Sequence, residues 1–267
     1  MKKVLAATMI FFVVSANAQM KEGRIVYERT FQLPMRFFAN ADPGLSSQIP
    51  KTRTDQYELL FDNNHSLWEF LPDASNDNDP NTFSSGGMVL RFASNSGEVA
   101  YYDFDNATSV SKREIADKSF IVSDSLSKLV WKLSDETKTI LTYTTHKAIT
   151  QKIAVRNRMT MENGVMKTEQ VSDTTNVIAW FTTDIPVPAG PGSYQGQLPG
   201  LILELDENKG QTVFKAIEVS PKVSVSKIKE PKDGKKLTAA EFAKEREKIL
   251  EEMRKNAPGG MQFRIQN

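Results

Sequence analysis

The chain has 267 residues, with 34 Lys and Arg against 33 Asp and Glu, and a formal net charge of +1. Hydrophobic residues make up 39% and charged residues 25%, a composition typical of a chain that folds around a core. The balanced charge argues against a nucleic-acid partner, and the absence of cysteine excludes disulfides, thiol catalysis and thiolate metal sites. Because only two histidines occur, His65 and His146, we expect neither a metal centre nor a cofactor.

The first residues have the order of a secretory signal peptide. Lys2 and Lys3 precede an apolar run over 4–14, and small residues follow at Ala16 and Ala18. The run is shorter than the about 20 apolar residues that cross a bilayer. The pattern predicts cleavage after Ala18 and export to the periplasm or the outside of the cell. No later stretch has membrane-spanning length, so we expect no transmembrane segment in the mature chain.

From Gly23 to Val219 the chain consists of short apolar runs that alternate with polar residues and are separated by turn clusters. This pattern predicts a mainly β protein, with an antiparallel curled sheet, an open barrel or a sandwich. The segments 54–61 and 66–71 flank an Asx-rich turn and are expected to pair as a hairpin. The segments 88–92 and 98–104 are expected to form a second hairpin. Further separate strands are expected at 146–155, 158–161, 165–171 and 177–182.

The last part of the chain changes character. A lysine-rich stretch, 221–236, is interpreted as a solvated basic linker, with contact to an anionic surface as the alternative. Thr238 and Glu241 have capping-box spacing, and good helix formers follow from Ala239 to Asn256. We expect this helix to dock on the sheet through its apolar residues, Phe242, Ile249 and Met253.

The sequence therefore predicts four parts. Residues 1–18 are a signal peptide, 19–220 an antiparallel β domain, 221–236 a basic linker, and 237–267 a C-terminal helix and tail.

One loop, between Ile185 and Leu205, is rich in proline and glycine. Pro199-Gly200 fits the centre of a type II turn, which predicts a positive φ at Gly200. The neighbouring apolar residues are too hydrophobic for an ordinary loop tip; they are Leu198, Leu201 and Ile202. They either fill the end of the protein's own core or form a docking surface for a partner or an apolar ligand.

The same loop carries a resemblance to a known family. Residues 197–202 read QLPGLI, and 179–191 read AWFTTDIPVPAGP. This region resembles the GLPGLI family of secreted and envelope proteins of the Bacteroidetes, although Gln197 stands where the family's name has glycine. The resemblance implies export and a β fold, and it implies no biochemical activity.

Two classes of function remain open. The first is a noncatalytic cell-envelope β scaffold that binds a partner protein or an apolar small molecule. The second is an envelope hydrolase that uses carboxylate chemistry, for which no catalytic residue is assigned. The scarcity of histidine and the lack of a nucleophile motif favour the first. The candidate binding residues are Trp180, Tyr194, Pro199, Gly200, Leu201 and Ile202.

Overall fold

A computed structural model of the chain describes residues 19–33, 51–72, 82–85, 88–91, 98–162 and 165–256. The expected signal peptide, 1–18, lies outside the described residues.

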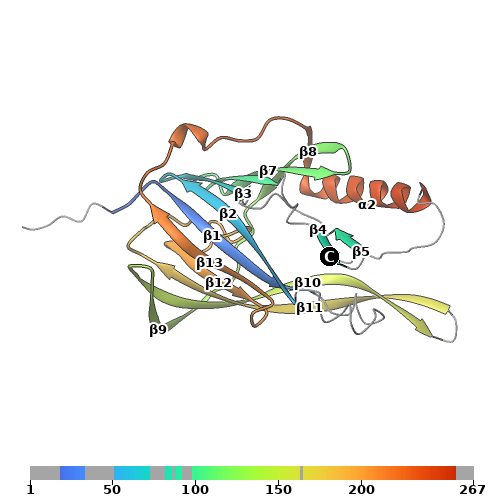
Figure 1. Ribbon diagram of the computed structural model, residues 1–267, viewed down its shortest axis with the longest axis horizontal. Coiled ribbons are helices and arrows are strands. Elements are labelled where there is room, and N and C mark those ends of the chain that lie inside the picture. Colours follow the sequence, from blue (N-terminus) through green and yellow to red (C-terminus); the bar gives the residue numbers. More distant parts are fainter. Residues whose placement is uncertain are drawn as a thin grey trace, which may run out of the picture.

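Fourteen strands and one α-helix make up the described elements (Figure 1). The strands are β1 (Gly23–Gln32), β2 (Thr52–Phe61), β3 (His65–Leu71), β4 (Thr82–Ser85), β5 (Met88–Arg91), β6 (Val99–Asp103), β7 (Thr108–Ile115), β8 (Lys118–Ser125), β9 (Lys132–Ile140), β10 (Tyr143–Glu162), β11 (Val165–Thr182), β12 (Leu201–Glu207), β13 (Thr212–Ser220) and β14 (Lys235–Thr238). A 3₁₀ turn, η2 (Val225–Lys227), and the helix α2 (Ala239–Asn256) complete the set.

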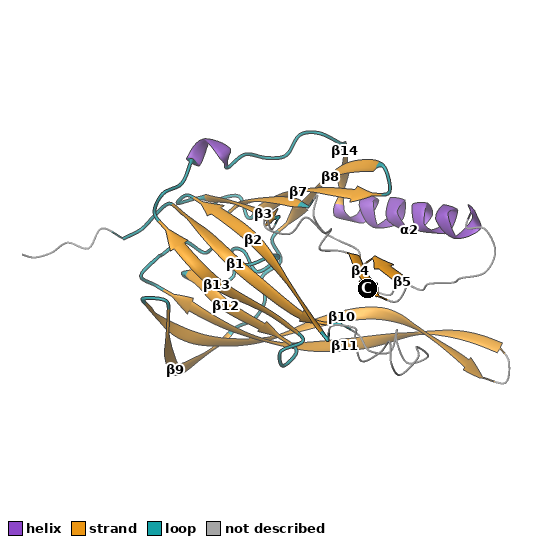
Figure 2. Cartoon of the chain, in the orientation of Figure 1, coloured by secondary structure: helices purple, strands orange, loops and turns teal. Residues whose placement is uncertain are grey.

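Twelve strands form one curled sheet in the order β14-β8-β7-β6-β3-β2-β1-β13-β12-β11-β10-β9 (Figure 2). All neighbours pair antiparallel except β14, which runs parallel to β8. The sheet is not closed into a barrel, since β14 and β9 are its two edges. The prediction of a mainly β, curled antiparallel sheet with one C-terminal helix is confirmed.

The first predicted hairpin is present. The second is absent, so that prediction is wrong. β2 and β3 pair around the turn at 62–64. β5 pairs with β4 in a separate two-stranded sheet, whereas β6 lies between β3 and β7. A turn cluster between two apolar runs signals a change of chain direction, but it does not specify which strand each run joins.

Two strands are longer than the sequence pattern indicated. The four separate strands expected between 146 and 182 are two continuous strands, β10 and β11, which pair with each other from His146–Phe181 to Glu162–Val165. Only their inner parts join the sheet, through β9 and β12. The rest projects beyond it as a two-stranded ribbon (Figure 1). A polar stretch such as 172–176 ends a hydrophobic alternation, but it does not interrupt backbone pairing.

The concave face of β1, β2 and β11–β13 carries the main core. Tyr27 and Leu59 are fully buried there, and they pack with Leu201, Leu203 and Leu205. Burial raises the pKa of the Tyr27 hydroxyl, which donates a hydrogen bond of 2.5 Å to the Ile202 carbonyl.

The helix α2 begins with the predicted capping box. The Glu241 carboxylate accepts a 2.8 Å bond from the Thr238 N–H, and the Glu241 N–H donates to the Thr238 hydroxyl at 3.3 Å. Phe242 and Ile249 are buried against Phe120 and Val122 of β8 and its neighbours, as expected.

The prediction that Met253 also docks is wrong, since this residue is 51% exposed. Met253 lies near the end of α2, and the last turns of this helix extend past the end of β8 (Figure 2). The described part of the chain contains no helix that is both long enough and apolar enough to cross a membrane.

The lysine-rich stretch, 221–236, crosses the convex face of the sheet. Ile228 is buried there with Leu60, Leu67 and Tyr101. The lysines of the stretch are exposed, and its last two residues begin β14. The backbone is thus attached to the sheet both at Ile228 and at β14, while the charges remain in solvent.

Candidate functional site

The six candidate binding residues do not form one surface. Leu201 and Ile202 have at most 1% of their surface exposed and belong to the core. Trp180 lies on the convex face, where the Lys138 ammonium sits 4.3 Å from its ring centroid. Pro199 is exposed, and Tyr194 is buried with one side facing a cavity.

Gly200 is required for a different reason from the one expected. It does not have a positive φ, so the prediction of a type II turn there is wrong. A Cβ at this position would lie only 2.1 Å from the Thr182 carbonyl oxygen. The loop therefore passes directly over the end of β11, and glycine permits that approach.

Two glutamines that sequence reasoning did not select hold the loop in place. The buried Gln195 amide oxygen accepts bonds of 3.1 Å from the Ser66 hydroxyl and from the Gly190 N–H. The Gln197 amide oxygen accepts a hydrogen bond of 2.9 Å from the Leu129 N–H, and the amide nitrogen of Gln197 donates one of 2.9 Å to the Ser127 carbonyl. The only signal in the sequence was the glutamine that replaces the first glycine of the family motif.

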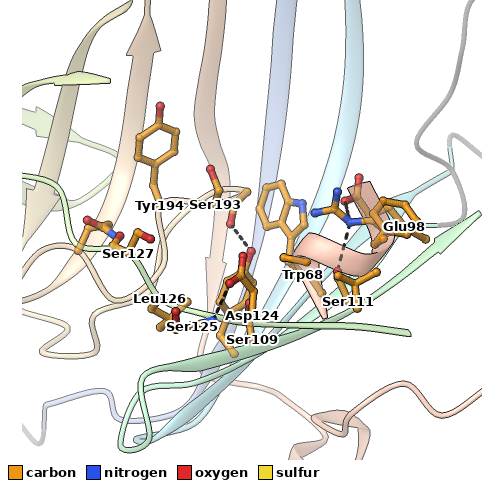
Figure 3. Close-up of a pocket in the computed structure, with 18 of the residues that line it drawn as sticks. Trp68, Glu98, Ser109, Ser111, Asp124, Ser125, Leu126, Ser127, Ser193 and Tyr194 are labelled. Carbon is orange, nitrogen blue, oxygen red and sulfur yellow. Dashed lines mark hydrogen bonds and ion pairs between the residues drawn. The ribbon is translucent and has the colours of Figure 1, made fainter. Parts of the chain in front are cut away.

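A cavity of about 630 Å³ opens next to this loop (Figure 3). Its walls come from the concave faces of β3 and β6–β8, the loop at 192–197, the segment 125–129, and the first turns of α2. Four other strands contribute one residue each: Arg29 of β1, Tyr57 of β2, Lys152 of β10 and Phe214 of β13. The cavity therefore depends on elements that are distant in sequence.

The strand register explains the cavity floor. Trp68 is paired with Ala100, Ala100 with Ser111, and Ser111 with Val122, so the four side chains form one row on the concave face. All four line the cavity. Their neighbours in sequence point to the convex face, where Leu67 packs under Ile228.

Three aromatic rings form one wall. Tyr57 is stacked on Trp68 with ring centroids 4.9 Å apart and an angle of 9° between the planes. Phe214 meets both rings edge-on, at 6.5 Å from Tyr57 and 6.1 Å from Trp68. Such contacts hold the rings in one arrangement, so this wall is preformed.

A charged group adjoins the aromatic wall. The Arg29 guanidinium lies between the rings of Phe31 and Tyr57, 5.0 and 4.9 Å from their centroids, and it also forms an ion pair with Asp55. Asp55 is buried and forms a second ion pair, with Arg53, in which Nη2 lies 2.9 Å from the carboxylate Oδ1. Burial is the main cause that raises the pKa of the Tyr57 hydroxyl to about 12. Among the described residues that hydroxyl has no hydrogen-bond partner.

The opposite end of the cavity is polar and carries serines. Figure 3 shows Ser193 and Asp124 pointing toward one another there, with Ser109 and Ser125 beside them. The Tyr102 hydroxyl donates a hydrogen bond of 2.9 Å to the Gly192 carbonyl, and burial raises the pKa of this hydroxyl.

Two carboxylates line the cavity, Glu98 and Asp124, and they lie at different levels of the sheet. Asp124 is in register with Ser109, while Glu98 contacts Arg113 at 3.6 Å. Ser109 and Arg113 are four residues apart on β7, about 13 Å at 3.3 Å per residue. The two carboxylates therefore start from backbone positions that are offset along the strands, and they do not form a facing pair.

No group of three or more His, Asp or Glu side chains that could hold a metal ion occurs in the described ranges. What the cavity offers chemically is stacking, hydrogen bonding from hydroxyls and amides, and charged groups of both signs, among which Arg29 adjoins the aromatic wall.

Comparison with protein families gives one match. A family described as "Protein of unknown function (Porph_ging)" matches residues 131–204, the part of the chain that contains the QLPGLI segment. The GLPGLI family suggested by that segment is not confirmed by this match. A search of curated proteins found no match.

Comparison with solved structures finds two crystal forms of one protein, "Structure of PNGF-II in C2 space group" and "Structure of PNGF-II in P21 space group". Both are 18% identical to this chain and cover 84% of it, with TM-scores of 0.50 and 0.49 respectively. The chain spans about a third of the length of those structures, 32% and 33%. At this identity the C2 form shows a likeness of fold alone.

Proposed function

We propose that this protein is a noncatalytic binding protein that holds a small molecule in the cavity between the curled sheet and α2. The observation that carries the proposal is the preformed aromatic wall of Tyr57, Trp68 and Phe214 on a cavity of about 630 Å³. That volume lies within the range of about 300–1,000 Å³ typical of small-molecule sites.

The lining defines the kind of ligand. Aromatic rings bind an apolar or flat surface, whereas the serines and charged groups require a ligand with polar substituents. A purely apolar molecule would leave the buried Tyr57 hydroxyl, which has no hydrogen-bond partner among the described residues, without compensation on desolvation. The ligand is therefore amphipathic.

The alternative, hydrolysis by two carboxylates, receives no support from the cavity geometry. The four-residue offset along β7 separates Glu98 from Asp124, and Glu98 is engaged by Arg113. A hydrolase of this class needs two carboxyl groups about 5–10 Å apart on either side of one bond.

The proposal is tested with the neutral fluorescent probe N-phenyl-1-naphthylamine, whose emission rises in apolar surroundings. We expect saturable binding with a stoichiometry of one. Ser111→Phe fills the middle of the cavity floor and should weaken binding about tenfold or more. Ser123→Phe makes the same change at an exposed position on the neighbouring strand and should leave binding unaltered.

Melting curves of both variants show whether each is folded, and Ala100→Leu provides a second block on the same row. If the wild type shows saturable binding neither of this probe nor of its sulfonated analogue 1-anilinonaphthalene-8-sulfonate, or if the folded Ser111→Phe and Ser123→Phe proteins bind alike, the cavity is not the binding site and the proposal fails.

We also propose that the protein acts in the cell envelope after export. The support is the signal-peptide pattern at 1–18 and the resemblance of 197–202 to the GLPGLI motif. Mass spectrometry of the mature protein should find Gln19 as the first residue. A mature chain that begins at Met1 would contradict export by this route.

A further inference from the structure

The arginine end of the cavity carries more chemistry than a general binding site needs. We infer that this end binds an acidic group. The inference rests on the proposed function, and it makes the ligand a small molecule with a flat apolar body and one carboxylate or comparable acid.

The first support is the position of Arg29 relative to the aromatic wall. Cross-strand pairing places Arg29 on β1 directly beside Phe214 on β13 and beside Asp55 on β2. Its guanidinium carbon is 4.9 Å from the Tyr57 ring centroid, and Tyr57 stacks on Trp68. A flat body against the aromatic wall thus has its edge within reach of the guanidinium group.

The second support is the number of unused donors. Arg29 directs Nη2 to Asp55, while Nε is buried without a hydrogen-bond partner among the described residues. The Tyr57 hydroxyl is also buried without a hydrogen-bond partner among the described residues. Unsatisfied buried donors cost free energy in the empty protein, and an acidic oxygen that accepts from them recovers that cost.

The third support is charge. Asp55 is shared between Arg29 and Arg53, and Glu98, the other carboxylate whose charge acts on the Tyr57 hydroxyl, contacts Arg113, so the Arg29 guanidinium is only partly neutralised. An arginine also offers a planar arrangement of donors that matches a carboxylate or a sulfonate. Positive charge in a site lined by buried rings acts through a lower dielectric than water, which strengthens attraction to an anion.

Two of the other three cavity-lining cations, Arg113 and Lys152, are placed differently. Arg113 contacts Glu98, and the Lys152 ammonium lies 5.9 Å from the ring centroid of Tyr194, which is not one of the three rings of the aromatic wall. They provide matched controls, because a general attraction of anions to the cavity would involve them equally.

The test compares two probes with the same aromatic body. 1-Anilinonaphthalene-8-sulfonate carries one sulfonate, and N-phenyl-1-naphthylamine lacks it. The wild type should bind the sulfonate probe about tenfold or more tightly than the neutral one, as expected for a charge-assisted hydrogen bond. Arg29→Met should remove that preference, so that the two probes bind this variant with affinities within about twofold of each other. Lys152→Met should preserve the preference.

Each remaining outcome is decisive. If both probes bind but the sulfonate gives no advantage, or if Lys152→Met removes the advantage as fully as Arg29→Met, the inference is overturned and the proposed function stands. If neither probe binds, the proposed function fails and the inference fails with it. Should Arg29→Met not fold, Arg29→Lys takes its place, because it keeps a charge beside Asp55 but loses the planar donors. An undiminished preference in that variant overturns the inference.

Discussion

The two ends of the concave face differ, although one curled sheet forms both. At one end the loop at 183–200 lies across the sheet and buries Ile185, Val187 and Ala189 against the strands. At the other end the first turns of α2 lie beside the face, and a cavity of about 630 Å³ remains between them, the edge of the loop and the segment 125–129. The same architecture thus becomes core or binding site according to what crosses it.

The two covers are also attached differently. Backbone and side-chain bonds tie the loop to the sheet, including the Leu201 N–H to the Ile185 carbonyl at 3.1 Å and the two glutamine amides. In contrast, α2 rests on Phe242 and Ile249 at the edge of the sheet. We therefore expect the filled end to be rigid and the helix to open at lower free energy.

The largest expected effect is at the filled end. Ile202→Ala removes a side chain that is 1% exposed and should lower the free energy of unfolding by about 2–5 kcal/mol. Ile153→Ala, at a position that is 69% exposed on β10, is the matched control and should cost little. Denaturant unfolding measures both. Equal midpoints for the two variants would show that the start of β12, onto which the loop packs, is not part of the core.

Gly200→Ala should have the next largest effect. The added Cβ would meet the Thr182 carbonyl oxygen at 2.1 Å, so the loop must shift away from β11, and we expect a cost of about 1–3 kcal/mol. At Gly192 a Cβ meets nothing within 4 Å, although its φ is +55°. Gly192→Ala therefore reports backbone strain alone, about 1 kcal/mol. If Gly192→Ala proves the more damaging substitution, close approach does not govern Gly200.

The smallest expected effect concerns the stability of α2, the helix beside the cavity. Hydrogen bonds from the Thr238 N–H and hydroxyl lower the pKa of Glu241 below the usual carboxyl value. Because the folded pKa is the depressed one, the cap contributes above the usual carboxyl pKa and is lost as pH falls through the folded value. Hydrogen-exchange protection of α2 should therefore decrease in acid more than protection of the central strands.

Thr238→Ala removes the hydroxyl from this cap but keeps the backbone N–H, so it should reduce the extra acid sensitivity of α2 and lower the helix's protection at neutral pH. Thr144→Ala, at an exposed position on β10, serves as the control. Acid sensitivity that persists unchanged in Thr238→Ala would assign it to another carboxylate.

Local features were predictable from the sequence. The hairpin around 62–64 follows from two alternating runs that flank Asx residues, and the capping box follows from the spacing of Thr238 and Glu241. Burial of Leu201 and Ile202 follows from their apolarity in a loop. In each of these cases the signal lies within a few residues of the structure it specifies.

Features that depend on distant segments were not predictable in the same way. The pairing of β5 with β4, the exposure of Met253 and the requirement for Gly200 all depend on where another part of the chain lies. The binding residues expected in the loop were placed by apolarity alone, whereas the cavity takes its aromatic wall from β2, β3 and β13.

The sequence by itself determined the alternation that makes strands, the polarity of each strand face and the position of the C-terminal helix, because these depend on side-chain chemistry at periods of two and about 3.6 residues. Only the tertiary structure decided that Arg29, Tyr57, Trp68 and Phe214 meet at one cavity. They meet because cross-strand register aligns residues up to 185 positions apart, as in the Arg29–Phe214 pair, and register is set by the packing of whole strands.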